Sequence, residues 1–126
     1  MPVLLAVALG GVLGSLARWG VDEAMPATGP GDWPWATLTV NLVGAFAIGA
    51  LLTSGLLVSR PHWWRPLLVT GVLGGFTTFS ALALETGVML DAGRPLAAIG
   101  YLTVTVAGGL AAVVLGRSLG SRRGAT

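Results

Sequence analysis

The segment GVLGGFTTFS, residues 71–80, lies at the centre of a long apolar run in this 126-residue chain. The run extends over residues 66–90, and Glu85 is its one charged residue. About 20 apolar residues suffice to cross the ~30 Å hydrocarbon core of a bilayer as a helix. Paired glycines followed by paired β-branched threonines are a poor centre for such a helix. The run therefore predicts a membrane span that is weakened near its middle.

Two interpretations of residues 74–78 stay open on these residues alone. An interrupted helix would free backbone carbonyls and amides, which then need a ligand, an ion or protein as partner. Broken helices of transport proteins use such groups to hold ions. The alternative is a continuous, glycine-softened helix whose threonine hydroxyls bond to its own carbonyls.

Three further apolar runs, at residues 2–19, 35–58 and 95–116, have the same character. Of the whole chain, 54% is hydrophobic and only 10% is charged, and the mean hydropathy is +0.83. Soluble domains carry about 25% charged residues, so this chain lacks the polar surface of a soluble domain. We predict an all-α membrane protein with one domain, residues 1–126, of four spanning helices. No basic region precedes the first run, so we expect it to be retained and not cleaved.

Boundary residues indicate how the spans are oriented. The five tryptophans fall at span ends, where an aromatic belt is expected: Trp19, Trp33, Trp35, Trp63 and Trp64. With four spans, five arginines lie on the side of the termini, namely Arg60, Arg65, Arg117, Arg122 and Arg123. The opposite side holds Arg18 and Arg94 beside four carboxylates. This bias predicts both termini in the cytoplasm. We also expect the chain to lie in the inner (plasma) membrane.

Several classes of function lack their residues. The chain has no cysteine, and its single histidine, His62, lies in a charged loop. No carboxylate pair, Ser-His-Asp set, phosphate loop or metal-ligand cluster is present, so we expect no enzyme activity. The scattered arginines form no patch for nucleic acid.

Polar residues inside the spans are the functional candidates, because they are costly in lipid. Asn41 fits both an interhelical link and a pore lining. Tyr101 and Thr105 share one face of the fourth span, and their hydroxyls could line a wet track or bond between helices. Glu85 could instead extend towards the headgroups or pair with a loop arginine. Glycines spaced by four, at positions 10 and 14 and at 71 and 75, predict close helix contacts.

Three motifs in order carry a family resemblance. Residues 10–19 read GGVLGSLARW, and residues 37–41 read TLTVN with Gly44 and Gly49 following. The third is the GGxTTFS pattern within residues 71–80. Together they cover nearly the whole chain, which resembles the Fluc (CrcB) family of fluoride channels.

The resemblance implies passive export of fluoride from the cytoplasm, which reduces its toxicity. It implies an antiparallel dimer with two pores, an interrupted third helix, and one central sodium ion held by backbone carbonyls of Gly74 and Thr77. It also implies the residues that line or approach the fluoride path: Asn41, Phe79, Thr78, Ser80, Tyr101, Thr105, Glu85 and Arg18.

The chain departs from the family pattern at three positions. Leu82 stands where a second phenylalanine is usual, Ala81 replaces a threonine, and Gly109 stands where a hydroxyl is often found. These losses, with the arginine bias, motivate a heterodimer with an oppositely oriented homologue as an alternative to a homodimer. Two other functions are the alternatives. A proton-coupled drug or cation exporter needs a carboxylate in the first span, and residues 1–19 contain none. A non-conducting structural subunit would leave Asn41 and residues 74–78 as packing features.

Overall fold

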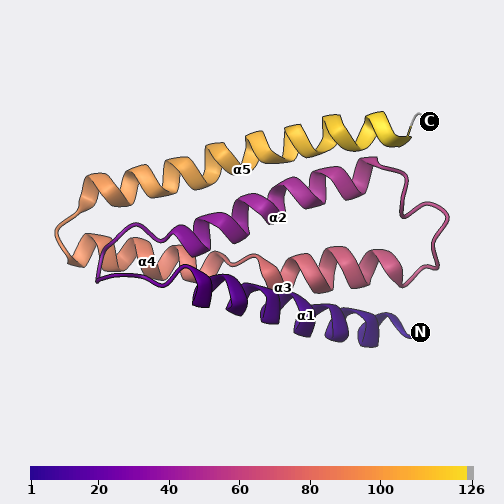
Figure 1. Cartoon of the computed structure of the whole chain (residues 1–126), viewed down its shortest axis with the longest axis horizontal. Coiled ribbons are helices and arrows are strands. Elements are labelled where there is room, and N and C mark those ends of the chain that lie inside the picture. The colour runs from indigo at the N-terminus through magenta and orange to yellow at the C-terminus, as the bar shows by residue number, and fades with distance from the viewer. Residues whose placement is uncertain (125–126) are drawn as a thin grey trace.

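The computed structural model describes residues 1–124, which form helices joined by loops and contain no strand (Figure 1). The elements are α1 (Val3–Ala24), α2 (Trp35–Thr53), the π-helical segment η1 (Pro66–Leu73), α3 (Gly74–Phe76), α4 (Phe79–Asp91) and α5 (Pro95–Gly124). Four stretches are long and apolar enough to cross a membrane: Val3–Ala24, Trp35–Thr53, Pro66–Asp91 and Pro95–Arg122. The four expected spans are confirmed to that extent.

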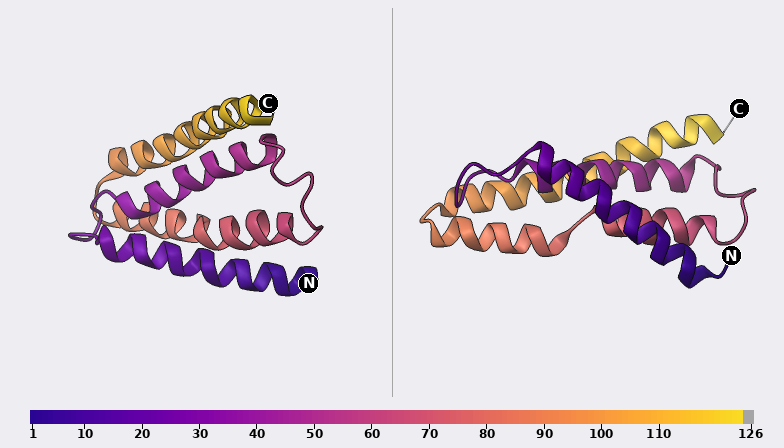
Figure 2. Two further views of the ribbon diagram at one scale, coloured as in Figure 1. Left: turned by 45° about the vertical axis from the view of Figure 1, so that its right-hand side comes forward. Right: turned by 60° about the horizontal axis from the view of Figure 1, so that its bottom comes forward.

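The third span contains two residues of extended backbone. Helix α3 ends at Phe76, Thr77 has φ −82° and ψ 157°, and Thr78 has φ −148° and ψ 124°. Figure 2 shows the resulting straight segment between the two helical parts. The Thr78 hydroxyl then caps α4 by accepting from the Ala81 amide at 3.2 Å. A cap of this kind gives a hydrogen-bond acceptor to one of the backbone amides that have no partner at the start of a helix.

Three helix ends differ from the expected span limits. Helix α1 continues past residue 19 to Ala24, so it includes Asp22 and Glu23. Helix α2 ends at Thr53 and not at residue 58, because Gly55 adopts a φ of +70°, outside the helical region. Helix α5 extends beyond residue 116 to Gly124. The Arg123 side chain, part of the expected basic flank, lies outside the described residues.

Glycines bring the first and third spans into backbone contact, as their spacing predicted. A Cβ added at Gly71 would lie 2.8 Å from the Gly10 Cα, and one at Gly75 would lie 2.5 Å from the Gly11 carbonyl oxygen. A Cβ at Gly14 would lie 2.8 Å from the Phe76 amide nitrogen. Real Cβ atoms do not approach so closely, so this packing requires glycine.

Helix α2 packs along α5 in the same manner (Figures 1 and 2). A Cβ at Gly116 would lie 3.0 Å from the Ala50 amide nitrogen, and one at Gly49 would lie 3.1 Å from that of Arg117. Small residues let helices pack closely where lipid supplies no hydrophobic drive. The four spans therefore form two glycine-packed pairs, α1 with the first half of the third span and α2 with α5.

Large apolar side chains cover the outside of the bundle on every span, and examples are Leu4, Val43, Leu84 and Leu110. The buried core is small by comparison, and its main cluster is made of Leu38, Leu82, Met89, Ala98 and Tyr101. A contiguous apolar exterior is unfavourable in water and requires lipid or another protein chain around it.

Candidate functional site

Asn41 of α2 is bonded to the extended backbone of the third span. Its Nδ2 donates to the Thr78 carbonyl oxygen at 2.9 Å, and its Oδ1 accepts from the Thr78 amide at 2.8 Å. Thr37 and Gly44 lie on the same helix face, and Gly44 adjoins the Thr77 side chain. Asn41 is thus a link between spans in this subunit. Its amide nitrogen carries a second N–H besides the one given to Thr78.

Two carbonyls beside this link lose their helical donors. In a continuous helix the Thr78 amide would bond to the Gly74 carbonyl, but it bonds to Asn41 instead. Likewise the Ala81 amide, which would bond to the Thr77 carbonyl, bonds to the Thr78 hydroxyl. Unpaired carbonyl oxygens are hard ligands of the type that holds Na⁺ at broken helices. The two residues implied as sodium ligands therefore have carbonyls that fit the role.

Glu85 joins three spans through its carboxylate. The Thr37 hydroxyl donates to Oε1 at 2.7 Å, and the Tyr101 hydroxyl donates to Oε2 at 2.6 Å. Tyr101 is fully buried, at 0% exposure. The carboxylate is therefore neither paired with an arginine nor extended to the headgroups, the two simpler expectations for it. Hydrogen bonds from two other spans therefore meet at this one carboxyl group.

The remaining hydroxyls lie in separate surroundings. Thr78 Oγ1 is 3.2 Å from Ser80 Oγ, and Ser80 is exposed. Thr105 is 9% exposed, and its hydroxyl has no hydrogen-bond partner among the described residues. A buried hydroxyl without a partner costs about 1–3 kcal/mol, so a bound water or ion would be favourable there.

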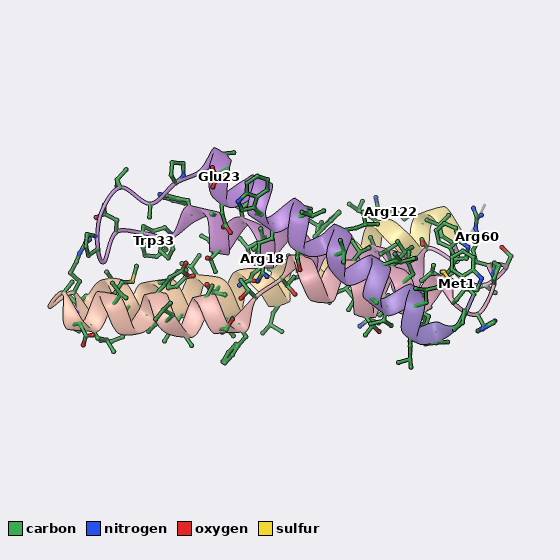
Figure 3. The ribbon with its side chains drawn as sticks, turned by 90° about the horizontal axis from the view of Figure 1, so that it is seen from below. Met1, Arg18, Glu23, Trp33, Arg60 and Arg122 are labelled. Atoms are coloured by element: carbon green, nitrogen blue, oxygen red, sulfur yellow. The ribbon has the colours of Figure 1, made fainter. Side chains whose placement is uncertain are left out.

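A cavity of about 1000 Å³ opens beside this cluster, between the C-terminal half of α1, the α1–α2 loop and the start of α4. The polar side chains that line it are Ser15, Arg18, Asp22, Thr28, Asp32, Thr37, Thr78 and Glu85. Figure 3 shows Arg18 about midway along the bundle, away from the end that carries Met1, Arg60 and Arg122. The half-buried Arg18 is the cation of this cavity.

Phe79 lies apart from the cavity. Its side chain is 80% exposed at the first position of α4, so it contacts little within this chain. This aromatic ring, next to the non-helical backbone of the third span, is therefore free to contact lipid or another protein chain.

Comparison with known proteins identifies the family. Residues 5–117 match the family described as CrcB-like protein, Camphor Resistance (CrcB). The chain belongs to this family. A relative from Nocardia farcinica, named fluoride-specific ion channel FluC 2, is 47% identical over 127 residues, which cover 98% of this chain and 87% of the relative. The fluoride-specific ion channel FluC of Chloroflexus aurantiacus is 43% identical over 120 residues, 93% of this chain and 94% of the relative.

A third relative, fluoride-specific ion channel FluC 1 of Mycolicibacterium paratuberculosis, is 48% identical over 118 residues, 92% of this chain and 88% of the relative. These matches confirm the Fluc (CrcB) resemblance. Together with the four apolar helices, they make this CrcB-family chain a multi-pass membrane protein.

The contacts of two residues at the site were not predicted from the sequence. Thr37 was noted only as part of the TLTVN motif, yet its hydroxyl bonds to Glu85. Its position, four residues before Asn41 and inside a span, is the signal that could have identified it. Trp33 was assigned to the aromatic belt, and its ring also packs against Tyr101.

Proposed function

We propose that this chain is a subunit of a fluoride-specific ion channel that lets fluoride leave the cytoplasm passively. The observation that carries the proposal is the 42–48% identity, over about nine-tenths of the chain or more, to relatives named fluoride-specific ion channels. Such channels are not enzymes.

The polar groups of the site suit the anion. Fluoride is small and strongly hydrated, so hydrogen-bond donors must replace its water shell as it enters the protein. The second N–H of Asn41 and the hydroxyls of Thr78, Ser80 and Thr105 are such donors, and an aromatic ring edge, as in Phe79, carries partial positive charge. Tyr101 gives its one hydroxyl hydrogen to Glu85, so it holds that carboxyl group beside the path. Arg18 attracts anions into the cavity, and weak contacts of this kind allow release.

We propose that the working unit is an antiparallel dimer with the third span interrupted near the bilayer midplane. Backbone that is not helical is tolerated at membrane depth only when protein or a water-filled cavity surrounds it. Gly74, Phe79 and Ser80, which flank the extended residues Thr77 and Thr78, are exposed in the single chain. A second subunit covering this face would shield it from lipid.

The same face suits a sodium ion at the dimer centre. The Gly74 and Thr77 carbonyls would hold it, since both have lost their helical donors. Gly74 has open space on its Cβ side, which leaves its backbone approachable by a partner subunit. A bound cation would supply fixed positive charge that lowers the cost of an anion in a medium of low dielectric constant.

We infer that the partner is either a second copy or an oppositely oriented homologue. Leu82, in place of the usual second phenylalanine, is 5% exposed and packs in the core with Tyr101, so it offers no ring edge to an anion. A homologue could supply the missing ring. The arginine bias supports an orientation with both termini in the cytoplasm and residence in the inner membrane.

The alternatives have less support. In α1 the carboxylates Asp22 and Glu23 belong to the last turn, beyond the apolar part of the span, where proton coupling to a drug or cation would need one within it. A non-conducting structural subunit would give no reason for two hydroxyls to converge on Glu85 inside the membrane.

The test is anion efflux from liposomes that contain the purified chain. We expect fluoride efflux well above that of protein-free liposomes and no chloride efflux above that background. Equal efflux of both anions, or none of either, would rule out a fluoride-specific channel formed by this chain alone. If the chain alone gives no efflux but co-reconstitution with an oppositely oriented homologue restores it, the heterodimer is supported.

A further inference from the structure

Trp33 is half-buried against other parts of the chain, although its position in the sequence is typical of a headgroup anchor. Its ring centroid is 5.6 Å from that of Tyr101, and the two rings meet edge to face at 72°. A Cβ added at Gly100 would lie 3.8 Å from the indole, so the ring also lies against the backbone of α5. Trp33 therefore packs against the first turns of α5, where Tyr101 is buried.

The indole contributes packing and not hydrogen bonding. Its Nε1 is buried and has no hydrogen-bond partner in the part of the chain that the structure describes. An unpaired buried donor costs about 1–3 kcal/mol. The ring packs instead against the core cluster of Leu38, Leu82, Met89, Ala98 and Tyr101. Edge-to-face aromatic pairs contribute about 0.5–1.5 kcal/mol beyond their buried area, which offsets part of that cost.

The two residues before Trp33 are tied to the opposite loop. Arg94 Nη1 donates to the Gly31 carbonyl oxygen at 2.6 Å and lies 3.2 Å from Asp32 Oδ1. The Thr28 hydroxyl donates to Asp32 Oδ2 at 2.6 Å. Gly31 has a φ of +77°, which a side chain rarely allows, so the chain turns sharply there towards Trp33. These contacts define where Trp33 enters the bundle.

We propose that Trp33 is a positioning residue for the ion pathway, which holds Tyr101 so that its hydroxyl donates to Glu85, and that Arg94 keeps Trp33 in place. The proposal rests on the proposed function for its effect on fluoride. A phenol ring with an indole against it cannot tilt into that space. With the indole removed, the ring gains room to tilt, and the 2.6 Å bond to Glu85 lengthens or breaks.

The direct test uses the fact that Tyr101 is the only tyrosine in the chain. In Raman spectra, the intensity ratio of the tyrosine doublet reports whether the phenol hydroxyl is a strong hydrogen-bond donor. The wild-type protein in detergent is expected to show the ratio of a strong donor. Trp33→Leu should move the ratio towards that of a weak donor, and Trp33→Phe, which keeps a ring, should stay near wild type. Trp64→Leu is the matched control. Trp64 is also half-buried, but it lies between α2 and η1, where it stacks on Trp63 and not on Tyr101.

Fluoride efflux from liposomes is the second measurement. We expect Trp33→Leu to lower the rate by about tenfold, within the range of coupling between contacting residues, and Trp33→Phe to retain most of it. If Trp33→Leu does not assemble, Arg94→Gln replaces it, because this change frees the loop without touching the core and should move the Raman ratio in the same direction.

The outcomes separate the two proposals. An unchanged Raman ratio in both Trp33→Leu and Arg94→Gln would overturn the positioning role, whatever the efflux. A changed ratio with wild-type efflux would show that the pathway does not depend on the Tyr101–Glu85 bond, which also overturns the proposal. A changed ratio in a protein whose wild type carries no fluoride would leave Trp33 as the positioning residue of Tyr101 and reject the channel function instead.

Discussion

Asn41 and Thr78 exchange two hydrogen bonds across the interior of the bundle, 2.9 Å from Nδ2 to the Thr78 carbonyl and 2.8 Å from the Thr78 amide to Oδ1. The Asn41 side-chain amide bonds to the Thr78 carbonyl and amide in place of a backbone partner, at the point where the third span is not helical. Two backbone groups at membrane depth are thereby satisfied by one residue of another helix.

Asn41→Ala should therefore affect both stability and transport. Two part-buried backbone groups lose their partners at about 1–3 kcal/mol each, so we expect a lower melting temperature and a loss of most fluoride efflux in protein that still assembles. Val43→Ala, two residues along the same helix and exposed, is the control and should resemble wild type. Wild-type efflux in Asn41→Ala would mean that the residue is only structural.

Phe79→Ile should reduce fluoride efflux strongly and leave assembly unchanged. The side chain is 80% exposed in the single chain, so little packing within the subunit is lost, whereas the ring edge offered to an anion disappears. Efflux is compared with that of Leu84→Ile, another exposed change on α4. If both variants conduct like wild type, the pore lining is assigned incorrectly.

Thr37→Val tests the link to Glu85 at nearly constant volume. The variant removes the hydroxyl that donates to Oε1 of Glu85 and keeps the Tyr101 hydroxyl that donates to Oε2. A part-buried group that loses its hydrogen-bond partner costs about 1–3 kcal/mol, and we expect a fall in efflux of about tenfold or more. Thr39→Val, on the same helix, should behave as wild type, since Thr39 makes only a 3.9 Å contact to the Met25 sulfur. Similar losses in both variants would argue against a specific role for Thr37.

The α1–α2 loop should loosen in acid. The Thr28 hydroxyl, and after it Arg94, hold the pKa of Asp32 below its usual value of 3.8, although partial burial opposes them. Because this pKa is lowered in the folded protein, the contacts of the Asp32 carboxylate with Thr28 and Arg94 are fully formed above about pH 4. They are lost as the pH falls through the lowered pKa. An NMR titration of the Asp32 carboxyl in detergent measures it. Thr28→Val should return the pKa towards its usual value, and an unchanged titration would exclude the Thr28 bond as the cause.

Sodium should stabilise the assembled protein if the Gly74 and Thr77 carbonyls hold it. Replacing sodium by N-methylglucamine at constant ionic strength should lower the melting temperature. Once the site is saturated, each tenfold rise in sodium adds about 1.4 kcal/mol to the folded, assembled state. Melting temperatures that do not depend on sodium would reject the site, and potassium serves as the control for a general salt effect.

Much of the architecture could be predicted because it depends on local properties. Span number follows from runs of apolar residues whose length matches the bilayer, and close packing follows from glycines four residues apart. The weak centre of the third span was visible in residues 71–80, since Gly-Gly and Thr-Thr each disfavour a helix. Where α2 ends was not predicted, because one glycine with positive φ decides it and the apolar run continues beyond it.

The sequence by itself determined that this chain is a membrane protein with four spans and that the third span has a glycine-rich, weakly helical centre. These features depend on hydropathy and helix propensity, which act over neighbouring residues. Tertiary structure alone decided what the polar residues of those spans do. Asn41 is 37 residues from Thr78, and Thr37 is 48 residues from Glu85, so no local pattern encodes these bonds. They exist because unpaired polar groups are costly in a low-dielectric interior, and packing brings each of them to a partner.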